Sequence, residues 1–179
     1  NSPLTFTSAN WNSAQTVTVT GVDDNIIDGT TPSTITITID DANSDNDFDP
    51  VADQTVSATT TDNDVAGFTV VQSGGSTSVS EAGTTDTFTV VLNAQPASNV
   101  VIAMSSSDTG ETTLSGTLTF TPANWNSAQT VTVTGVDENI IDGTITSTIT
   151  VAVIDAISDN DFDAVAHQTV FVSTTDNDT

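Results

Sequence analysis

The sequence contains no lysine, no arginine, no cysteine and no tyrosine. Against 24 aspartate and glutamate residues this leaves a formal charge of −24. Binding to nucleic-acid phosphate or to an anionic membrane surface depends on lysine and arginine, so we expect neither as a partner. Because the self-repulsion of so many carboxylates has to be offset, the composition predicts cations bound from solution.

The absence of cysteine rules out disulfides as a source of stability, and it neither proves nor excludes secretion. No apolar run is long enough to span a bilayer, so we expect no membrane insertion. Without lysine or arginine, a trypsin-like protease finds no cleavage site, which favours a protein exposed outside the cell. Low basic usage in a salt-loving or marine lineage explains the same absence equally well. We expect an extracellular or cell-surface location.

What the sequence has in place of these features is a long repeat. The stretch LTFTPANWNSAQTVTVTGVDENIIDG begins at Leu118, and a nearly identical stretch begins at Leu4, an offset of 118 − 4 = 114 residues. The segment 44–64 returns at the same spacing as 158–178. This period is too long for a solenoid repeat, and it suits an independently folding β-domain.

The repeat register divides the chain unequally. Residues 1–64 match only the C-terminal half of the unit, whereas residues 65–179 make one complete copy. We therefore interpret the chain as a window from a longer array, with neighbouring repeats as its partners. The opening strands that the first copy lacks would come from upstream residues or from another molecule, so strand sharing in a homopolymer stays open.

Valine and isoleucine alternate with threonine along several segments, which is typical of half-buried β-strands. The alternation and the turn residues between segments predict an all-β fold of tandem immunoglobulin-like antiparallel β-sandwiches, with the first copy incomplete. The predicted strands are 4–7, 16–20, 33–40 and 54–61 in the first copy, and 67–71, 76–80, 87–93 and 100–106 before the repeated half of the second.

Strand parity predicts where the acidic loops lie, because successive loops of such a sandwich alternate between its two ends. Four acidic stretches of the complete copy then converge on one end: Glu81 with Asp86, Asp108 with Glu111, Asp137 with Glu138 and Asp142, and Asp176 with Asp178. The loop with Asp159, Asp161 and Asp163 falls at the opposite end. In a tandem arrangement it would approach the exit end of the preceding copy, which carries Asp23, Asp24, Asp28, Asp62 and Asp64.

Clusters of carboxylate and carbonyl oxygens suit Ca²⁺, which accepts about 6 to 8 such ligands in flexible geometry. Zinc would need cysteine and histidine partners that are missing here. The SDNDFD run is similar to the start of an EF-hand loop, but it has no glycine at the sixth place and Val56 at the twelfth, so an EF-hand is rejected. Acids that merely solvate the loops are the alternative to a metal site.

The motif VSEAG near the start of the complete copy, GVDEN after a TVTVT strand and a closing DND resemble the Calx-β family. The resemblance covers residues 65–178 in full and 3–64 in part. It implies a β-sandwich that binds several Ca²⁺ ions at one end, often in arrays of extracellular adhesins. The residues it implies as ligands are Glu81, Asp108, Asp137, Glu138, Asp142, Asp176 and Asp178, with Asp23, Asp24, Asp28, Asp62 and Asp64 in the first copy. The family's usual further glutamate is missing at Thr144 and Ile145, and Asn177 interrupts its terminal acidic triplet.

These observations predict a calcium-stiffened structural module of a secreted or cell-surface protein, such as an adhesin stalk or an extracellular filament. A carbohydrate-binding accessory module of a secreted enzyme is the alternative, because Trp11 and Trp125 sit in matching NWN loops and could stack on sugar rings. A glycan or another surface ligand therefore stays open as a partner. His167 has no accompanying nucleophile arrangement, so we expect no enzyme activity.

Overall fold

The computed structural model describes residues 3–179, which divide into two compact units. The half unit comprises the chain up to Asp24 together with Thr30–Asp62. The complete unit comprises Asn25–Gly29 together with Asn63–Thr179. The segment Asn25–Gly29 lies inside the first repeat in sequence but belongs structurally to the complete unit. The predicted domain boundary after residue 64 remains a prediction.

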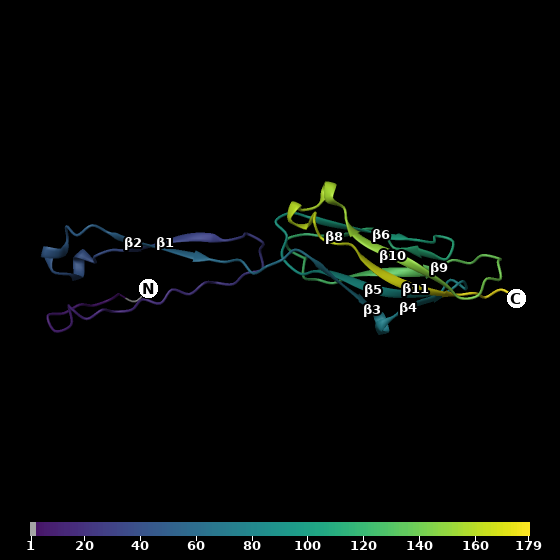
Figure 1. The fold of residues 1–179 in the computed structure, drawn as a ribbon, viewed down its shortest axis with the longest axis horizontal. Helices are drawn as coiled ribbons and strands as arrows, with labels where there is room; N and C mark the ends of the chain where they lie inside the picture. Colours follow the sequence, from purple (N-terminus) through teal and green to yellow (C-terminus); the bar gives the residue numbers. More distant parts are fainter. Residues whose placement is uncertain (1–2) are drawn as a thin grey trace. The chain divides into compact units, whose positions relative to one another are not determined.

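The complete unit is a β-sandwich of two stacked sheets (Figure 1). In their order across the five-stranded sheet, its strands are β4 (Thr77–Ser80), β11 (Gln168–Thr175), β10 (Ile145–Val153), β6 (Val100–Ser106) and β8 (Leu118–Phe120). The four-stranded sheet has the order β3 (Phe68–Gln72), β5 (Thr85–Leu92), β9 (Gln129–Gly135) and β7 (Thr112–Leu114). Neighbouring strands are antiparallel except for β4 and β11, which pair in parallel. The predicted all-β sandwich is confirmed, and the parallel pair and β7 are additions to it.

The core between the sheets is formed by the apolar members of the alternating strands. Val131 and Val133 of β9 and Ile149 and Val151 of β10 are fully buried, while the threonines between them face outward. Phe88, Phe120 and Phe162 fill the same core without any exposed surface. Burial of this apolar area is the main favourable contribution to folding of the complete unit, at about 25 cal/mol per Å².

The half unit contains an antiparallel pair, β1 (Thr31–Ile37) and β2 (Gln54–Thr60), joined by the 3₁₀ turns η1 (Asp41–Asn43) and η2 (Asn46–Phe48). The prediction of strands at 4–7 and 16–20 was wrong, because neither segment forms a strand. Their counterparts in the complete unit are β8, which pairs with β6, and residues 130–134 of β9, which pairs with β5 and β7. The sequence of the first copy contains no counterpart of β5, β6 or β7, so these segments have no ladder to join.

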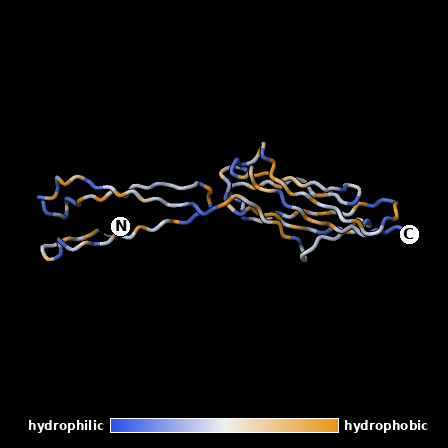
Figure 2. The backbone as a smooth tube through the Cα atoms, in the orientation of Figure 1, coloured by the Kyte–Doolittle hydropathy of each residue, from blue (hydrophilic) through white to orange (hydrophobic). Residues whose placement is uncertain are grey.

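Apolar residues, orange in Figure 2, occur along the strands of the complete unit and along the corresponding segments of the half unit. Their burial differs. Phe6 and Val19 are 52% and 57% exposed, whereas their counterparts Phe120 and Val133 are fully buried. The half unit therefore presents apolar side chains that a sandwich would normally enclose.

Three further 3₁₀ turns lie in the complete unit: η3 (Ser73–Gly75), η4 (Asp155–Ile157) and η5 (Asn160–Phe162). No helix within residues 3–179 has the length and hydrophobicity required to cross a bilayer.

Candidate metal centre

Six carboxylates gather at the end of the complete unit where the chain terminates. Glu81, Glu111, Glu138 and Asp142 each bring one oxygen to within 4.8 Å of the others. Glu81, Asp176 and Asp178 form a second group on the same criterion, so Glu81 belongs to both. We call these six residues the acidic cluster. Among the described residues, these are the two groups of three or more potential metal-ligating side chains.

Glu81 is held by the turn that follows β4. Its backbone N–H donates to the Thr175 carbonyl at 3.1 Å, which extends the parallel pairing of β4 with β11. On the other side, the Gly135 N–H donates to the Thr84 carbonyl at 3.0 Å. A Cβ atom on Gly135 would lie 2.1 Å from the Ser80 carbonyl oxygen, so only glycine permits this approach of β9 to the turn.

The loop between β9 and β10 supplies Glu138 and Asp142, and the C-terminal segment anchors that loop. Asp176 accepts hydrogen bonds at Oδ2 from the backbone N–H groups of Asp142 (3.1 Å) and Gly143 (2.9 Å). Gly143 adopts a φ of 79°, in the left-handed region that favours glycine. Asn177, in the same C-terminal segment, bonds to this loop and to the turn after β4, since its Nδ2 donates to Asp137 Oδ1 at 3.1 Å and its backbone N–H donates to Glu81 Oε2 at 3.1 Å.

Two members of the cluster are almost entirely buried, with Glu81 exposing 1% and Glu111 exposing 4% of its surface. Four carboxylate oxygens of the cluster are buried without a hydrogen-bond partner: Glu81 Oε1, Glu111 Oε2, Glu138 Oε1 and Asp178 Oδ2. The protein has no lysine or arginine to neutralise them, and His167, its only histidine, is exposed in the segment before β11. A buried carboxylate without a partner is strongly unfavourable, so the arrangement fits a cation supplied from solution.

The pKa shifts within the acidic cluster agree with a site for a cation. Burial, followed by repulsion from Asp142, Asp108, Glu81 and Glu138, raises the pKa of Glu111. Burial and the neighbouring acids also raise the pKa of Glu138. By contrast, hydrogen bonds from the backbone N–H groups of Gly143 and Asp178 lower the pKa of Asp176, which keeps that carboxylate ionised. The cluster thus combines an anchored anion with carboxylates that repel one another.

The donor set indicates which metal would fit. All six side chains offer oxygen, and neither cysteine nor histidine lies in the cluster, so zinc is disfavoured. Ca²⁺ accepts several carboxylates in flexible geometry, whereas Mg²⁺ requires near-octahedral geometry and retains water. The residues present fit a calcium ion.

Five of the residues named from the sequence are in the acidic cluster: Glu81, Glu138, Asp142, Asp176 and Asp178. Two others, Asp108 and Asp137, lie beside it but in neither group. Asp108 is exposed and close enough to raise the pKa of Glu111, and Asp137 is bonded to Asn177.

Glu111 was missing from the residues selected from the sequence, although its loop was placed at this end of the sandwich. The resemblance implied Asp108 as the ligand from this loop, and Glu111 was named only as a neighbouring acid of the same loop. In the structure Glu111 lies immediately before β7, a three-residue strand paired with β9, which draws its side chain into the unit. The short TTL run after Glu111 was the signal that could have identified it.

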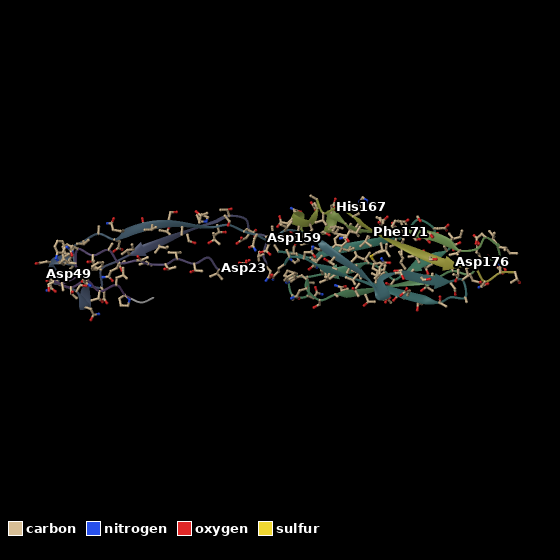
Figure 3. The ribbon with its side chains drawn as sticks, turned by 60° about the horizontal axis from the view of Figure 1, so that its bottom comes forward. Asp23, Asp49, Asp159, His167, Phe171 and Asp176 are labelled. Carbon is tan, nitrogen blue, oxygen red and sulfur yellow. The ribbon has the colours of Figure 1, made fainter. Side chains whose placement is uncertain are left out.

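Asp159 lies at the end of the complete unit opposite Asp176 (Figure 3). Its Oδ2 accepts a hydrogen bond from the Ser98 N–H at 2.6 Å, and its Oδ1 accepts one from the Asp161 N–H at 3.1 Å. Burial alone would raise its pKa, but these hydrogen bonds outweigh burial and lower it. Asp159 therefore caps η5 and ties it to the loop after β5. Asp161 and Asp163 are exposed, and all three lie outside the metal groups.

The acids predicted as ligands in the first copy are distributed over both units. Asp23, Asp24 and Asp62 belong to the half unit, and Asp28 and Asp64 to the complete unit. None is in the acidic cluster. The sequence offers the first copy no counterpart of Glu81 or Glu111, the two buried members, so calcium binding by these residues remains a prediction.

The two tryptophans differ in environment. Trp125 is half-buried and packs against the core, and its carbonyl accepts a hydrogen bond from the Leu92 N–H at 3.2 Å. Trp11 is 70% exposed. In the complete unit the NWN loop therefore acts as a lid on the core.

Comparisons with known proteins assign this chain to no family. No protein-family model and no curated protein matches this sequence. Among solved structures, the apo-form Calx CBD1 domain is 14% identical, with a TM-score of 0.43, over 62% of this chain and 98% of that one. Domains 4 and 5 of the S-layer protein SbsC are 23% identical, with a TM-score of 0.44, over 70% and 54%. The MSP-domain-like protein SSP-19 of Caenorhabditis elegans is 19% identical, with a TM-score of 0.39, over 59% and 97%. These values leave the function to be argued from the site.

Proposed function

We propose that this protein is a structural, Calx-β-like repeat module of a secreted or cell-surface protein, and that Ca²⁺ bound by the acidic cluster stabilises its fold. The observation that carries the proposal is the pair of buried glutamates, Glu81 and Glu111, whose unpartnered oxygens meet other carboxylates in a protein without lysine or arginine. Ordinary solvation of acidic loops would leave such side chains at the surface.

A calcium ion at this place would neutralise charge and cross-link segments that are distant in sequence. Glu81 comes from the turn after β4, Glu111 from the start of β7, and Glu138 from the loop after β9. Asp176 and Asp178 come from the end of β11 and beyond. Joining four segments at one end of the sandwich would stabilise the native state in proportion to the free calcium concentration.

Several features favour a mechanical role in an array. The sequence repeats with a period of 114 residues, and the acids in the second half of the unit recur in the first copy. A high free calcium concentration outside cells would keep weak sites loaded, and extracellular calcium modules bind with dissociation constants on the order of 10⁻⁴ to 10⁻³ M. We therefore place the module in an extracellular stalk or filament and assign it no enzyme activity.

The carbohydrate-binding alternative is less well supported. It requires an aromatic surface on which a sugar ring can stack, and Trp125 instead packs against the core of the complete unit. Loss of glycan binding by Trp125→Ala on a glycan array would favour that alternative over the structural role.

Thermal unfolding with and without calcium tests the proposal. We expect Ca²⁺ at about a hundred times its dissociation constant to stabilise the complete unit by roughly 2.7 kcal/mol relative to chelator, with Mg²⁺ much less effective. Glu81→Gln should abolish most of this stabilisation, because Glu81 belongs to both groups. Asp41→Asn, an exposed acid of the half unit, is the matched control. A melting temperature that does not respond to calcium would refute the metal assignment.

A further inference from the structure

The two copies of the segment NIIDG occupy different surroundings. In the first copy, Asn25–Gly29 belongs to the complete unit. The Gln95 N–H donates to the Asn25 carbonyl at 2.7 Å, and Ile26 forms an isolated parallel β-bridge with Gln95. Ile27 is half-buried and packs against the core cluster. A five-residue loop of one repeat is thus seated on the sandwich of the next.

The second copy of the segment, Asn139–Gly143, has the same five residues, but its isoleucines are not packed on a core. Ile140 is 60% exposed and Ile141 is 70% exposed. Two adjacent β-branched apolar side chains at the tip of a polar, acidic loop serve no local packing purpose. The repeat therefore presents an exposed Ile141 at the end of the unit, whereas the first-copy counterpart of this residue, Ile27, is half-buried.

The exposed loop is fixed in place by its neighbours in the structure. Hydrogen bonds from the backbone N–H groups of Asp142 and Gly143 to Asp176 hold the end of the loop. The bond from Asn177 to Asp137 holds the residues just before it. Gly29 and Gly143 have similar φ values of 71° and 79°, so both copies of the segment end in the same backbone conformation. Because the loop is already ordered, docking it would cost little conformational entropy.

The receiving surface is equally well defined. The Gln95 side chain donates to the Pro122 carbonyl at 3.0 Å, which joins its loop to the loop that carries Trp125. Ala94 beside it is fully buried, and Asn93 donates to the Gly67 carbonyl at 2.9 Å. We call this surface the Gln95 edge.

The Gln95 edge and the Asn139–Gly143 loop lie at opposite ends of the complete unit. The loop after β5, which includes Gln95, is bonded to Asp159 through Ser98, and the Asn139–Gly143 loop is bonded to Asp176. Figure 3 shows Asp159 and Asp176 at opposite ends of this unit. A module with a donor loop at one end and its acceptor at the other is suited to head-to-tail assembly.

We propose that Asn139–Gly143 docks on the Gln95 edge of a following copy of the complete repeat, as Asn25–Gly29 docks on this one. The backbone carbonyl of Asn139 accepts a hydrogen bond from the Gln95 N–H of the following copy, and Ile141 packs against the core of that following copy. The occupant is another copy of this same repeat. The inference rests on the proposed role as a repeat module but not on the metal.

The test uses the full chain extended by one repeat, with residues 1–178 followed by a second copy of 65–179. Hydrogen exchange at the two Gln95 amides is then measured in one molecule. We expect both amides to be protected to a similar degree. Ile141→Ser should lower the protection of the second Gln95 by at least ~10-fold and leave the first unchanged, whereas Ile27→Ser should do the reverse.

The controls separate docking from folding and from calcium binding. Ile140→Ser should have the smaller effect, because its counterpart Ile26 remains 41% exposed when seated. In the original chain, Ile141→Ser should not change thermal stability, since its side chain is exposed there. The docking proposal is wrong if, in the extended chain without substitutions, the second Gln95 amide exchanges as fast as the first Gln95 amide does in the Ile27→Ser variant. Thermal shifts with calcium in the same molecule decide the proposed function separately.

Discussion

The two copies of the repeat place nearly the same sequence in two settings. In the complete unit the repeated segments pair with β5, β6 and β7, and in the half unit they do not. The hydrogen bonds of the NWN turn are the same in both. Thr7 donates its backbone N–H to Asn10 Oδ1 just as Thr121 donates to Asn124 Oδ1, both at 2.5 Å. The Gln15 side chain donates to the Thr5 carbonyl at 2.8 Å, and Gln129 repeats this bond at the same length.

What differs between the copies is burial and strand pairing. Val17 is 58% exposed while its counterpart Val131 is fully buried, although both sit in the motif TVTVT. The alternation of valine and threonine specifies which face of a segment is apolar. Whether that face is enclosed depends on strands from the other half of the sandwich, which residues 1–64 do not include. Substitutions at matched positions of the two copies measure this difference directly.

The largest difference is expected for the core phenylalanines. Phe120→Ala should destabilise the complete unit by about 3–5 kcal/mol, because it empties a fully buried site. Phe6→Ala, at the matching position 52% exposed, should change stability by about 0.5 kcal/mol or less. Denaturant unfolding followed by tryptophan fluorescence measures both, because Trp11 lies in the half unit and Trp125 in the complete unit. Equal losses in the two variants would mean that Phe6 is enclosed in solution.

The next difference concerns the glycines that follow the matching TVTVT motifs. Gly135→Ala should destabilise the complete unit by roughly 1–3 kcal/mol and weaken calcium binding, since its Cβ would collide with the Ser80 carbonyl and displace Glu81. A Cβ atom added at Gly21 would lie 3.5 Å from its nearest neighbour, the Thr60 methyl carbon, which is an ordinary contact, so Gly21→Ala should be nearly neutral. Calorimetric titration with Ca²⁺ gives the affinities. Unchanged calcium binding in Gly135→Ala would argue against a role for Glu81.

A smaller difference is expected for the aspartates that cap η5 and η2. Asp159 uses both carboxylate oxygens, whereas Asp45 uses only Oδ1, in a 3.0 Å bond from the Asp47 N–H. Asp159→Asn should therefore cost about 1 kcal/mol, and Asp45→Asn close to nothing. Because the pKa of Asp159 is lowered from 3.8, this stabilisation is present above pH 3.8 and disappears as the pH falls through the lower folded value. Urea unfolding at several pH values shows whether the cost of Asp159→Asn fades in that window.

The smallest expected effect is that of Glu111→Gln, which should change sign between chelator and calcium. Glu111 has no counterpart in the first copy. Its pKa is raised above 4.5, so in chelator its ionisation destabilises the fold increasingly as the pH rises through the folded value. Glu111→Gln should then stabilise the metal-free protein at pH 7, with the gain vanishing near pH 4.5. In calcium the same substitution should destabilise, because a ligand is lost. Melting curves under both conditions test the reversal, and a destabilisation in chelator as well would contradict it.

Much of the fold and part of the site could be predicted from the sequence. The alternating segments identified β3, β5, β6 and β10 within a few residues, and loop parity assigned four acidic stretches to one end of the sandwich. The prediction failed where pairing, rather than pattern, decides. Residues 16–20 have the pattern of a strand but no neighbour, and Thr112–Leu114 is too short for periodicity and becomes a strand only by pairing with β9.

The sequence by itself determined the repeat, the apolar face of each strand, the turn hydrogen bonds around Asn10 and Asn124, and a charge that only external cations can balance. The strand faces and the turn bonds depend on residues within a few positions of one another, and the repeat and the charge depend on the sequence alone. The tertiary structure decided which faces are buried and which carboxylates meet, bringing Glu81 together with Asp176 from 95 positions away (176 − 81). Such meetings depend on strand order and register between sheets, and it is there that Glu111 rather than Asp108 enters the cluster.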